Sequence, residues 1–209
     1  IPPDRFIRLA ERSGAINEIG RWALDQACLQ LRRWHDAGHE GWSMSVNLSP
    51  VQFSSPHLLQ DVRAVIERHN IAPRHLVLEI TESTVMRDTD TSLRLLQALS
   101  ALGVGISIDD FGTGYSSLLR LKRLPVQKLK IDQGFVAGLP WDEDDAAIVR
   151  VVIALAKSMS MQVHAEGIEQ VEQARFLLEQ DCDMGQGYWF GRPMPADEID
   201  WNRAPTLQP

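Results

Sequence analysis

Short apolar runs alternate with longer amphipathic stretches along most of the chain. The apolar runs have the length and β-branched character of strands, whereas the stretches between them repeat their apolar positions every three to four residues, as helices do. We expect six strands, at residues 42–48, 76–81, 104–109, 126–131, 162–165 and 184–189. We expect helices at residues 17–37, 56–69, 90–102, 116–123, 143–159 and 169–180.

Capping residues delimit several of these helices. Gly38 and Gly103 each follow the last periodic position of a helix, where a left-handed residue commonly ends it. Asp142 or Asp144 is the candidate cap for the helix at 143–159. The first helix is indicated by an apolar stripe, near which Ile19, Trp22, Ala23, Ala27 and Trp34 lie.

The alternation of strands with helices indicates right-handed βαβ units and a parallel sheet. A doubly wound open sheet and a closed (β/α)8 barrel both fit this pattern. Six strands preceded by a helix favour a TIM-type barrel whose first strands are missing. No linker or low-complexity segment divides the chain, so we expect one domain over residues 1–203 and a frayed tail at 204–209.

Polar side chains follow or end all six expected strands. In a parallel barrel these strand ends converge on one face, where active sites lie. Gathering several carboxylates there is costly unless a cation neutralises them. The residues are Asn47, Glu79, Asp109, Asp110, Lys130, Glu166 and Gln186.

This set of side chains suits hard divalent cations. Carboxylate and amide oxygens are ligands for Mg²⁺ or Mn²⁺, and no convergent His/Cys cluster indicates zinc. Asp109 could bridge two ions while Asp110 binds one, so that a water between the ions could attack phosphorus. Lys130 could contact that water or a phosphate oxygen.

Bulk properties narrow the function. The net charge of −7 argues against a broad nucleic-acid-binding surface, so we expect no DNA partner. Two cysteines, no apolar run of membrane-spanning length and no signal peptide indicate a cytoplasmic location. Because the chain starts at Ile1 without a methionine, we expect a fragment or an excised domain of a longer protein, which could itself be membrane-anchored.

An ordered set of motifs resembles those of the EAL family over nearly the whole chain, from about Pro3 to Pro195. Each motif alone is weak, but their order and spacing together are specific. They are Ser45-Val46-Asn47-Leu48-Ser49, Glu79-Ile80-Thr81-Glu82-Ser83, Asp109-Asp110-Phe111-Gly112-Thr113-Gly114, Leu129-Lys130-Ile131-Asp132, Ala165-Glu166-Gly167 and Gln186-Gly187-Tyr188.

The resemblance implies a modified TIM barrel that hydrolyses cyclic-di-GMP to linear pGpG with two Mg²⁺ or Mn²⁺ ions and is inhibited by Ca²⁺. It also implies a homodimer and an upstream sensory or regulatory domain. By resemblance, Asn47, Glu79 and Asp109 match ligands of the first metal, and Asp109, Asp110 and Glu166 match the second set. Lys130, Glu166 and Asp110 are then the candidate catalytic residues.

Three further positions match by resemblance, and a fourth, Pro193, is a candidate from its place in the last loop, which it could shape or where it could face a ligand. Gln186 and Glu169 correspond to further active-site positions. Glu82 corresponds to the glutamate that anchors the loop at residues 110–117, which in the family links the metal site to the dimer interface.

One departure separates the chain from the family pattern. The Glu-Ala-Leu motif, whose glutamate is a first-metal ligand in the family, would precede the segment resembling Pro3–Ala10 and is absent from this sequence. A non-catalytic cyclic-di-GMP receptor is therefore the alternative to an enzyme. An unrelated Mg²⁺-dependent barrel enzyme explains the carboxylates but not the adjacent aspartates or the motif order.

Two aromatic residues have open roles. Trp189 follows Gln186 closely and could stack on a base or belong to the core. His164 lies inside an expected strand, where packing or outward exposure is favoured over a ligand role.

Overall fold

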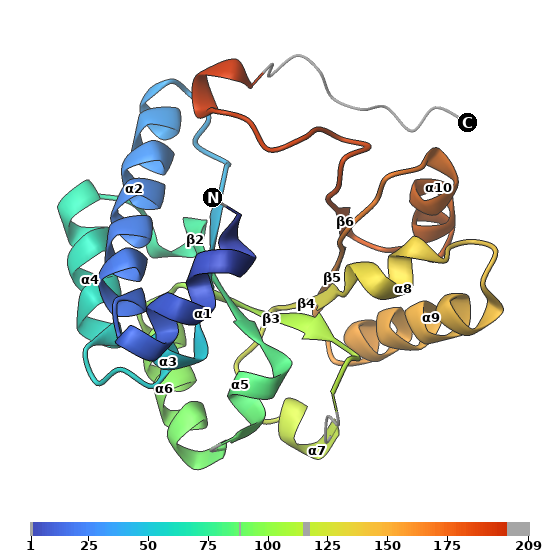
Figure 1. Ribbon diagram of the computed structural model, residues 1–209, viewed down its shortest axis with the longest axis horizontal. Helices are drawn as coiled ribbons and strands as arrows, with labels where there is room; N and C mark the ends of the chain where they lie inside the picture. The colour runs from blue at the N-terminus through green and yellow to red at the C-terminus, as the bar shows by residue number, and fades with distance from the viewer. Residues whose placement is uncertain (1, 88, 115–117, 200–209) are drawn as a thin grey trace. The chain divides into compact units, whose positions relative to one another are not determined.

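The computed structural model describes residues 2–87, 89–114 and 118–199 (Figure 1). Within this part of the chain, six strands form a sheet whose order follows the sequence. Register pairs show that β1–β2, β4–β5 and β5–β6 are parallel. The strands are β1 (Met44–Leu48), β2 (Leu76–Thr81), β3 (Gly105–Phe111), β4 (Lys128–Ile131), β5 (Gln162–Ala165) and β6 (Met184–Gly185).

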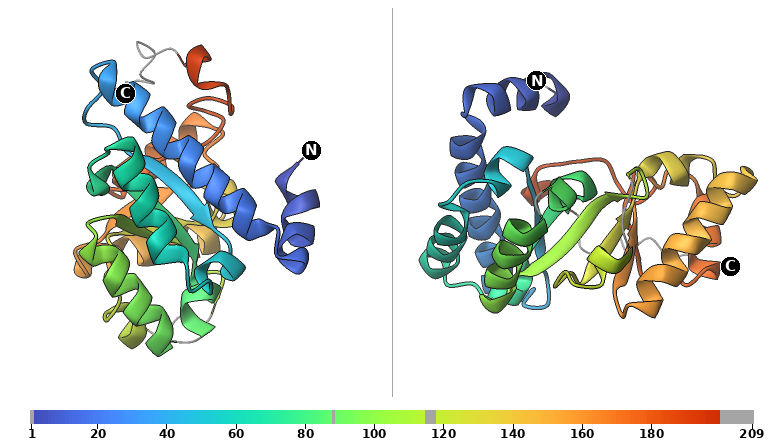
Figure 2. Two further views of the ribbon diagram at one scale, coloured as in Figure 1. Left: turned by 90° about the vertical axis from the view of Figure 1, so that its left-hand side faces the viewer. Right: turned by 90° about the horizontal axis from the view of Figure 1, so that it is seen from below.

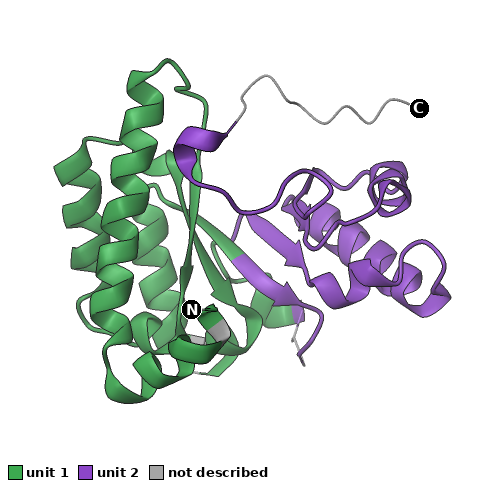
Figure 3. Ribbon diagram, turned by 45° about the horizontal axis from the view of Figure 1, so that its top comes forward, with its two compact units in different colours: residues 1–107, 119–125 green, residues 108–118, 126–209 purple. Residues whose placement is uncertain are grey.

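The chain forms two compact units, coloured separately in Figure 3. The first contains residues 1–107 and 119–125, and the second contains residues 108–118 and 126–209. The described part of the chain also contains the short helix α7 (Leu118–Leu121) and two 3-10 turns, at Pro73–His75 and Ala196–Glu198.

In the first unit, helices pack on β1 and β2. Figure 2 shows α2 and α4 side by side, and both views agree with their direct packing. The interior strand β2 is buried on both faces, as expected for a parallel strand covered by helices. The helices are α1 (Pro3–Ser13), α2 (Ile16–Asp36), α3 (Pro50–Phe53), α4 (Leu58–His69), α5 (Glu82–Arg87) and α6 (Thr89–Ala101).

In the second unit, α9 (Glu143–Ser158) packs on β4 and β5 and against α8 (Gln133–Ala137), and α10 (Val171–Glu179) follows β5 along the chain. Asp142 is the N-cap of α9: its Oδ1 accepts hydrogen bonds from the backbone N–H groups of Asp144 and Asp145, both at 3.0 Å. Of the two candidate caps, Asp142 is therefore the one that serves.

The buried face of the first long helix, α2, lies beside the apolar stripe seen in the sequence and is rotated from it about the helix axis. Trp22 is 65% exposed, and the buried positions of α2 are Ile16, Gly20, Leu24, Cys28 and Leu31. The reason is local packing, because Gly20 leaves room for the side chain of Gln52 from α3 to lie directly against the helix.

Several element boundaries also differ from expectation. The helices α1, α3, α5 and α8 were not predicted, since most are too short to show periodicity. The expected strands at 42–48, 126–131 and 184–189 are shorter in the structure, whereas β2 and β5 have the predicted bounds. The expected helix at 116–123 and the tail at 204–209 fall partly or wholly outside the described residues.

No helix in the described ranges is both long and apolar enough to cross a membrane.

Candidate metal and substrate site

The end of β3 presents two consecutive carboxylates. Side chains of successive strand residues normally point to opposite faces. At Asp110 the backbone enters the left-handed region, with φ of 53°, and its N–H donates to Asp109 Oδ1 at 3.1 Å. Thr113 Oγ1 donates to the Asp110 carbonyl at 2.8 Å and closes the turn. Because of this turn, the carboxylates of Asp109 and Asp110 lie close together although the residues are adjacent in sequence.

Lys130 and Glu166 come from the next two strands. The Lys130 ammonium lies 3.2 Å from Asp109 Oδ1 and 2.5 Å from Glu166 Oε1, and its side chain is only 3% exposed. Glu166 follows β5 directly, and its backbone N–H donates to the Ile131 carbonyl at 3.2 Å. The hydrogen-bonding of β4 with β5 therefore fixes the position of Glu166.

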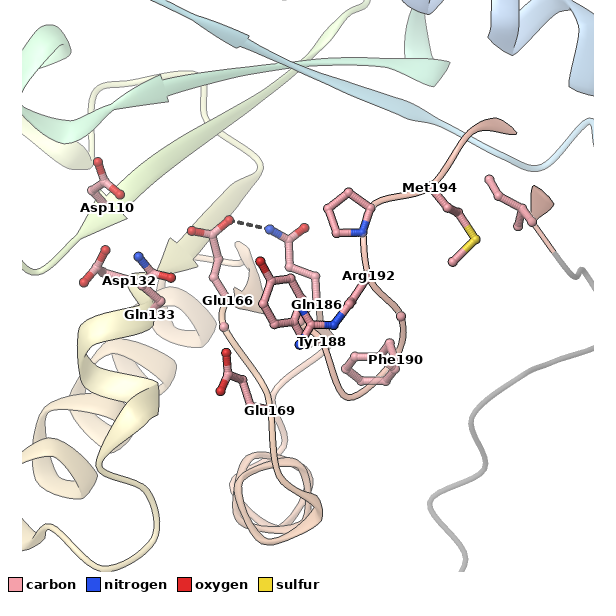
Figure 4. Close-up of a pocket in the computed structure, with 15 residues that line it drawn as sticks. Asp110, Asp132, Gln133, Glu166, Glu169, Gln186, Tyr188, Phe190, Arg192 and Met194 are labelled. Atoms are coloured by element: carbon pink, nitrogen blue, oxygen red, sulfur yellow. Dashed lines mark hydrogen bonds between the residues drawn. The ribbon is translucent and has the colours of Figure 1, made fainter. Parts of the chain in front are cut away.

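Gln186 fixes Glu166 from the other side. Its Nε2 donates to Glu166 Oε1 at 2.7 Å, as the dashed line in Figure 4 shows. The Gln186 backbone N–H donates to the Ala165 carbonyl at 2.9 Å, which places the side chain beside β5. Gly187 then passes so close to the Ile168 backbone that a Cβ there would overlap it, so this turn requires glycine.

The acidic cluster fits a divalent cation. One carboxylate oxygen from each of Asp109, Asp110 and Glu166 lies within 4.8 Å of the others. Burial, followed by the charges of Asp109 and Asp132, raises the pKa of Asp110. Holding Asp110 ionised is thus unfavourable without a cation, and three hard oxygen donors at this spacing are suited to one.

A cavity of about 870 Å³ opens beside this cluster, entirely within the second unit. Figure 4 shows Asp110, Asp132 and Glu166 toward one side, and Phe190 and Met194 toward the other. The cavity is also lined by the side chains of Gln133, Glu169, Gln186, Tyr188, Arg192 and Pro193.

A buried glutamine holds the loop that carries Glu169. Gln173 Oε1 accepts hydrogen bonds from the backbone N–H groups of Glu169 at 2.8 Å and Gln170 at 3.0 Å. Its Nε2 donates to the Val136 carbonyl at 3.1 Å, which ties the start of α10 to α8. Glu169 and Pro193, both candidate site residues, line the cavity.

The predicted residues of the first unit lie on adjacent strand ends. Asn47 of β1 and Glu79 of β2 are register partners, and the Glu79 side chain is buried. Glu82 begins α5 and is also buried. Within the second unit the structure brings together Asp109, Asp110, Lys130, Glu166 and Gln186. The predicted loop at 110–117 includes residues 115–117, which lie outside the described part.

The two aromatic residues with open roles stay away from the cavity wall. Trp189 is half-buried, contacts the Phe190 ring edge-to-face at 4.8 Å, and is not among the lining residues. His164 is largely enclosed in β5; burial, then Lys128 and Lys130, lowers its pKa to about 4. Packing is the better account of both.

Sequence reasoning missed Tyr188, Phe190 and Arg192 as cavity residues. The available signal was their concentration in residues 187–193, where aromatic and basic side chains alternate with Gly187, Gly191 and Pro193.

Comparison with known proteins identifies the family. The family model of the EAL domain matches residues 1–193. Over 199 residues the chain is 53% identical to the Pseudomonas aeruginosa protein named bifunctional diguanylate cyclase/cyclic di-GMP phosphodiesterase MucR, covering 95% of this chain and 29% of that protein. It is 44% identical to cyclic di-GMP phosphodiesterase NbdA of the same species, covering 95% of this chain and 25% of that protein. The chain thus spans less than a third of these relatives' length.

A solved structure, described as the PaMucR phosphodiesterase in complex with c-di-GMP, has a TM-score of 0.92 to this chain at 54% identity. The match covers 94% of this chain and 80% of that chain. The predicted α/β class with a TIM-type barrel is thereby confirmed, in preference to a doubly wound sheet. With a family match over residues 1–193 and relatives of this similarity, the chain belongs to the EAL domain family.

Proposed function

We propose that this chain hydrolyses cyclic-di-GMP to linear pGpG in a reaction that depends on two divalent metal ions. The observation that carries the proposal is the buried Lys130 ammonium held between Asp109 and Glu166, with Asp110 beside them. Such a cluster of carboxylates and one buried cation suits chemistry at a phosphodiester. The names of the relatives at 53% and 44% identity support the same substrate.

Mg²⁺ or Mn²⁺ fits the donor set better than a softer metal, because all candidate ligands are oxygen atoms. Asp109, Asp110 and Glu166 would hold one ion, and Asn47, Glu79 and Asp109 would hold the other. When bound, a pair of such ions supplies Lewis acidity to a phosphoryl oxygen and lowers the pKa of a water.

The chain's own residues have separate roles in this proposal. Lys130 orients the attacking water and stabilises charge on a phosphate oxygen. Glu166, fixed by its hydrogen bond from Gln186, receives the proton of that water. The water oxygen bonds to phosphorus as one P–O ester bond breaks, and the leaving ribose oxygen takes up the proton that Glu166 received, which leaves the linear dinucleotide. Asp110, Glu169 and Pro193 shape the substrate side, and Glu82 supports the loop at 110–117.

Product analysis with a matched variant tests the proposal. Wild-type protein with Mg²⁺ or Mn²⁺ should convert cyclic-di-GMP to pGpG, and Asp109→Asn should lower the rate by ~100-fold or more. Asp181→Asn is the control, since the Asp181 side chain is 84% exposed and forms a surface ion pair with Lys157. Undiminished turnover by Asp109→Asn would contradict the mechanism. Binding of the dinucleotide by wild type without any product would favour the non-catalytic receptor.

Regulation and assembly are further parts of the proposal. Because the relatives are much longer than this chain, we infer that an additional sensory or regulatory domain controls the activity. We also propose that the domain acts in the cytoplasm and forms a homodimer. Sedimentation of the purified chain over a concentration series would test the dimer, and a single monomer species throughout would reject it.

A further inference from the structure

Arg192 is the basic side chain among the described residues that line the cavity. Its guanidinium carbon lies 4.4 Å from the centroid of the Tyr188 ring, and Figure 4 shows the two side chains against each other. This is a cation–π contact, which restrains the guanidinium without using its N–H donors. No salt bridge within the described part of the chain involves Arg192.

The surroundings of Arg192 differ from those of the metal-ligand cluster. Phe190, Pro193 and Met194 line the cavity near it, whereas the carboxylates of Asp110, Asp132 and Glu166 lie toward the other side (Figure 4). An apolar and aromatic wall suits the face of a planar base, and the acidic side suits phosphate only with cations present. The part of the cavity beside Arg192 therefore matches a nucleobase better than a phosphate.

We propose that Arg192, braced by Tyr188, reads the O6/N7 edge of a guanine of the substrate and so determines base specificity. This inference rests on the proposed function for the identity of the dinucleotide. Guanine offers two adjacent acceptors on this edge, which match the paired N–H donors of a guanidinium. Adenine offers one acceptor and one donor there, so the same guanidinium would face a mismatched N–H group.

Tyr188 has a positioning role in this subsite. An arginine on an exposed loop loses much rotamer freedom when it binds, and a side chain already held against a ring loses less. Gly191 and Pro193 flank Arg192 in sequence. In the described part of the chain, the contact with the Tyr188 ring is the interaction that restrains the Arg192 side chain.

Dissociation constants of two ligands that differ at a single ring position, measured with wild type and two variants, test the assignment. The ligands are cyclic-di-GMP and its 7-deaza analogue, in which each N7 is replaced by C–H. Wild type should bind the analogue ~10-fold or more weakly, whereas Arg192→Gln should bind both ligands with nearly equal dissociation constants. Arg175→Gln, at an exposed position of α10, is the matched control and should keep the wild-type ratio.

The alternative outcomes are distinct. If Arg192→Gln kept the wild-type ratio of the two dissociation constants, whether or not both were weakened, Arg192 would contact a phosphate or nothing. The assignment would then be overturned. A wild type that fails to discriminate between the ligands would overturn it as well. Turnover of cyclic-di-GMP, assayed in parallel, tests the proposed function separately, because the binding ratio requires no hydrolysis.

Discussion

At the scale of single residues, the central feature is a buried lysine whose positive charge is balanced by neighbouring carboxylates. Lys130 is 2% exposed and lies between two carboxylates, and an ammonium so enclosed is tolerated because its partners satisfy it. Asp110 completes a group of three carboxylates around one cation. The cluster therefore retains an excess of negative charge, which suits the binding of further cations.

Replacing Lys130 by methionine keeps the length of the side chain and removes its charge. We expect turnover to fall by about 10²–10³-fold, since a positioned cation for phosphate charge is lost. Steady-state rates at saturating cyclic-di-GMP measure the effect. Lys157→Met is the matched control, because Lys157 also lies 3.2 Å from an aspartate oxygen but is exposed. Equal activity of the two variants would show that Lys130 has a structural role alone.

At the scale of secondary-structure elements, a charged contact joins α2 to α4. Asp25 Oδ1 lies 2.6 Å from Arg68 Nη1 and 2.9 Å from His69 Nε2. The hydrogen bond from His69, followed by that from Arg68, lowers the pKa of Asp25 below 3.8 in the folded protein. The folded state therefore favours the ionised carboxylate.

The sign of the resulting pH dependence follows directly. A carboxylate with a lowered folded pKa stabilises the protein above its unfolded pKa, near 3.8, and this contribution is lost as the pH falls through the folded value. We expect Asp25→Asn to cost up to about 1 kcal/mol of unfolding free energy at neutral pH. Urea unfolding from neutral pH to below pH 3.8 should show this difference shrink. A constant difference across that range would refute the electrostatic account.

The elements also show what the sequence could reveal. The bounds of β2 and β5 were predicted correctly: β2 is a mainly apolar run, and β5 alternates polar with buried apolar residues. The buried face of α2 was not, since Trp22 and Leu24 fit similar helical periods and the face is selected by tertiary packing on β1, α3 and α4. Strand-end residues such as Glu166 were found by position. Arg192 was missed because its contact with Tyr188 depends on loop conformation.

At the scale of the whole molecule, we expect the acidic cluster to couple the stability of the fold to metal binding. Because burial and neighbouring carboxylates raise the pKa of Asp110, its ionised form lowers the stability of the metal-free protein at neutral pH. This cost is relieved as the pH falls through the raised pKa. A bound cation would relieve it at neutral pH as well.

Thermal unfolding with and without metal tests this link. With a chelator present, Asp110→Asn should melt at or above the wild-type temperature. Adding Mn²⁺ at about 100 times its dissociation constant should stabilise wild type by roughly 2.7 kcal/mol and the variant by much less. A variant that gains as much from Mn²⁺ as wild type does would show that Asp110 is no ligand.

The most direct measurement is anomalous diffraction from crystals of this chain soaked in Mn²⁺. Oxygen donors from the ends of successive strands should place manganese within bonding distance of Asp109, with Asp110 and Glu166 completing the coordination of one ion. We expect two anomalous peaks that share Asp109. The absence of any peak beside Asp109 would contradict the proposed metal-dependent hydrolysis.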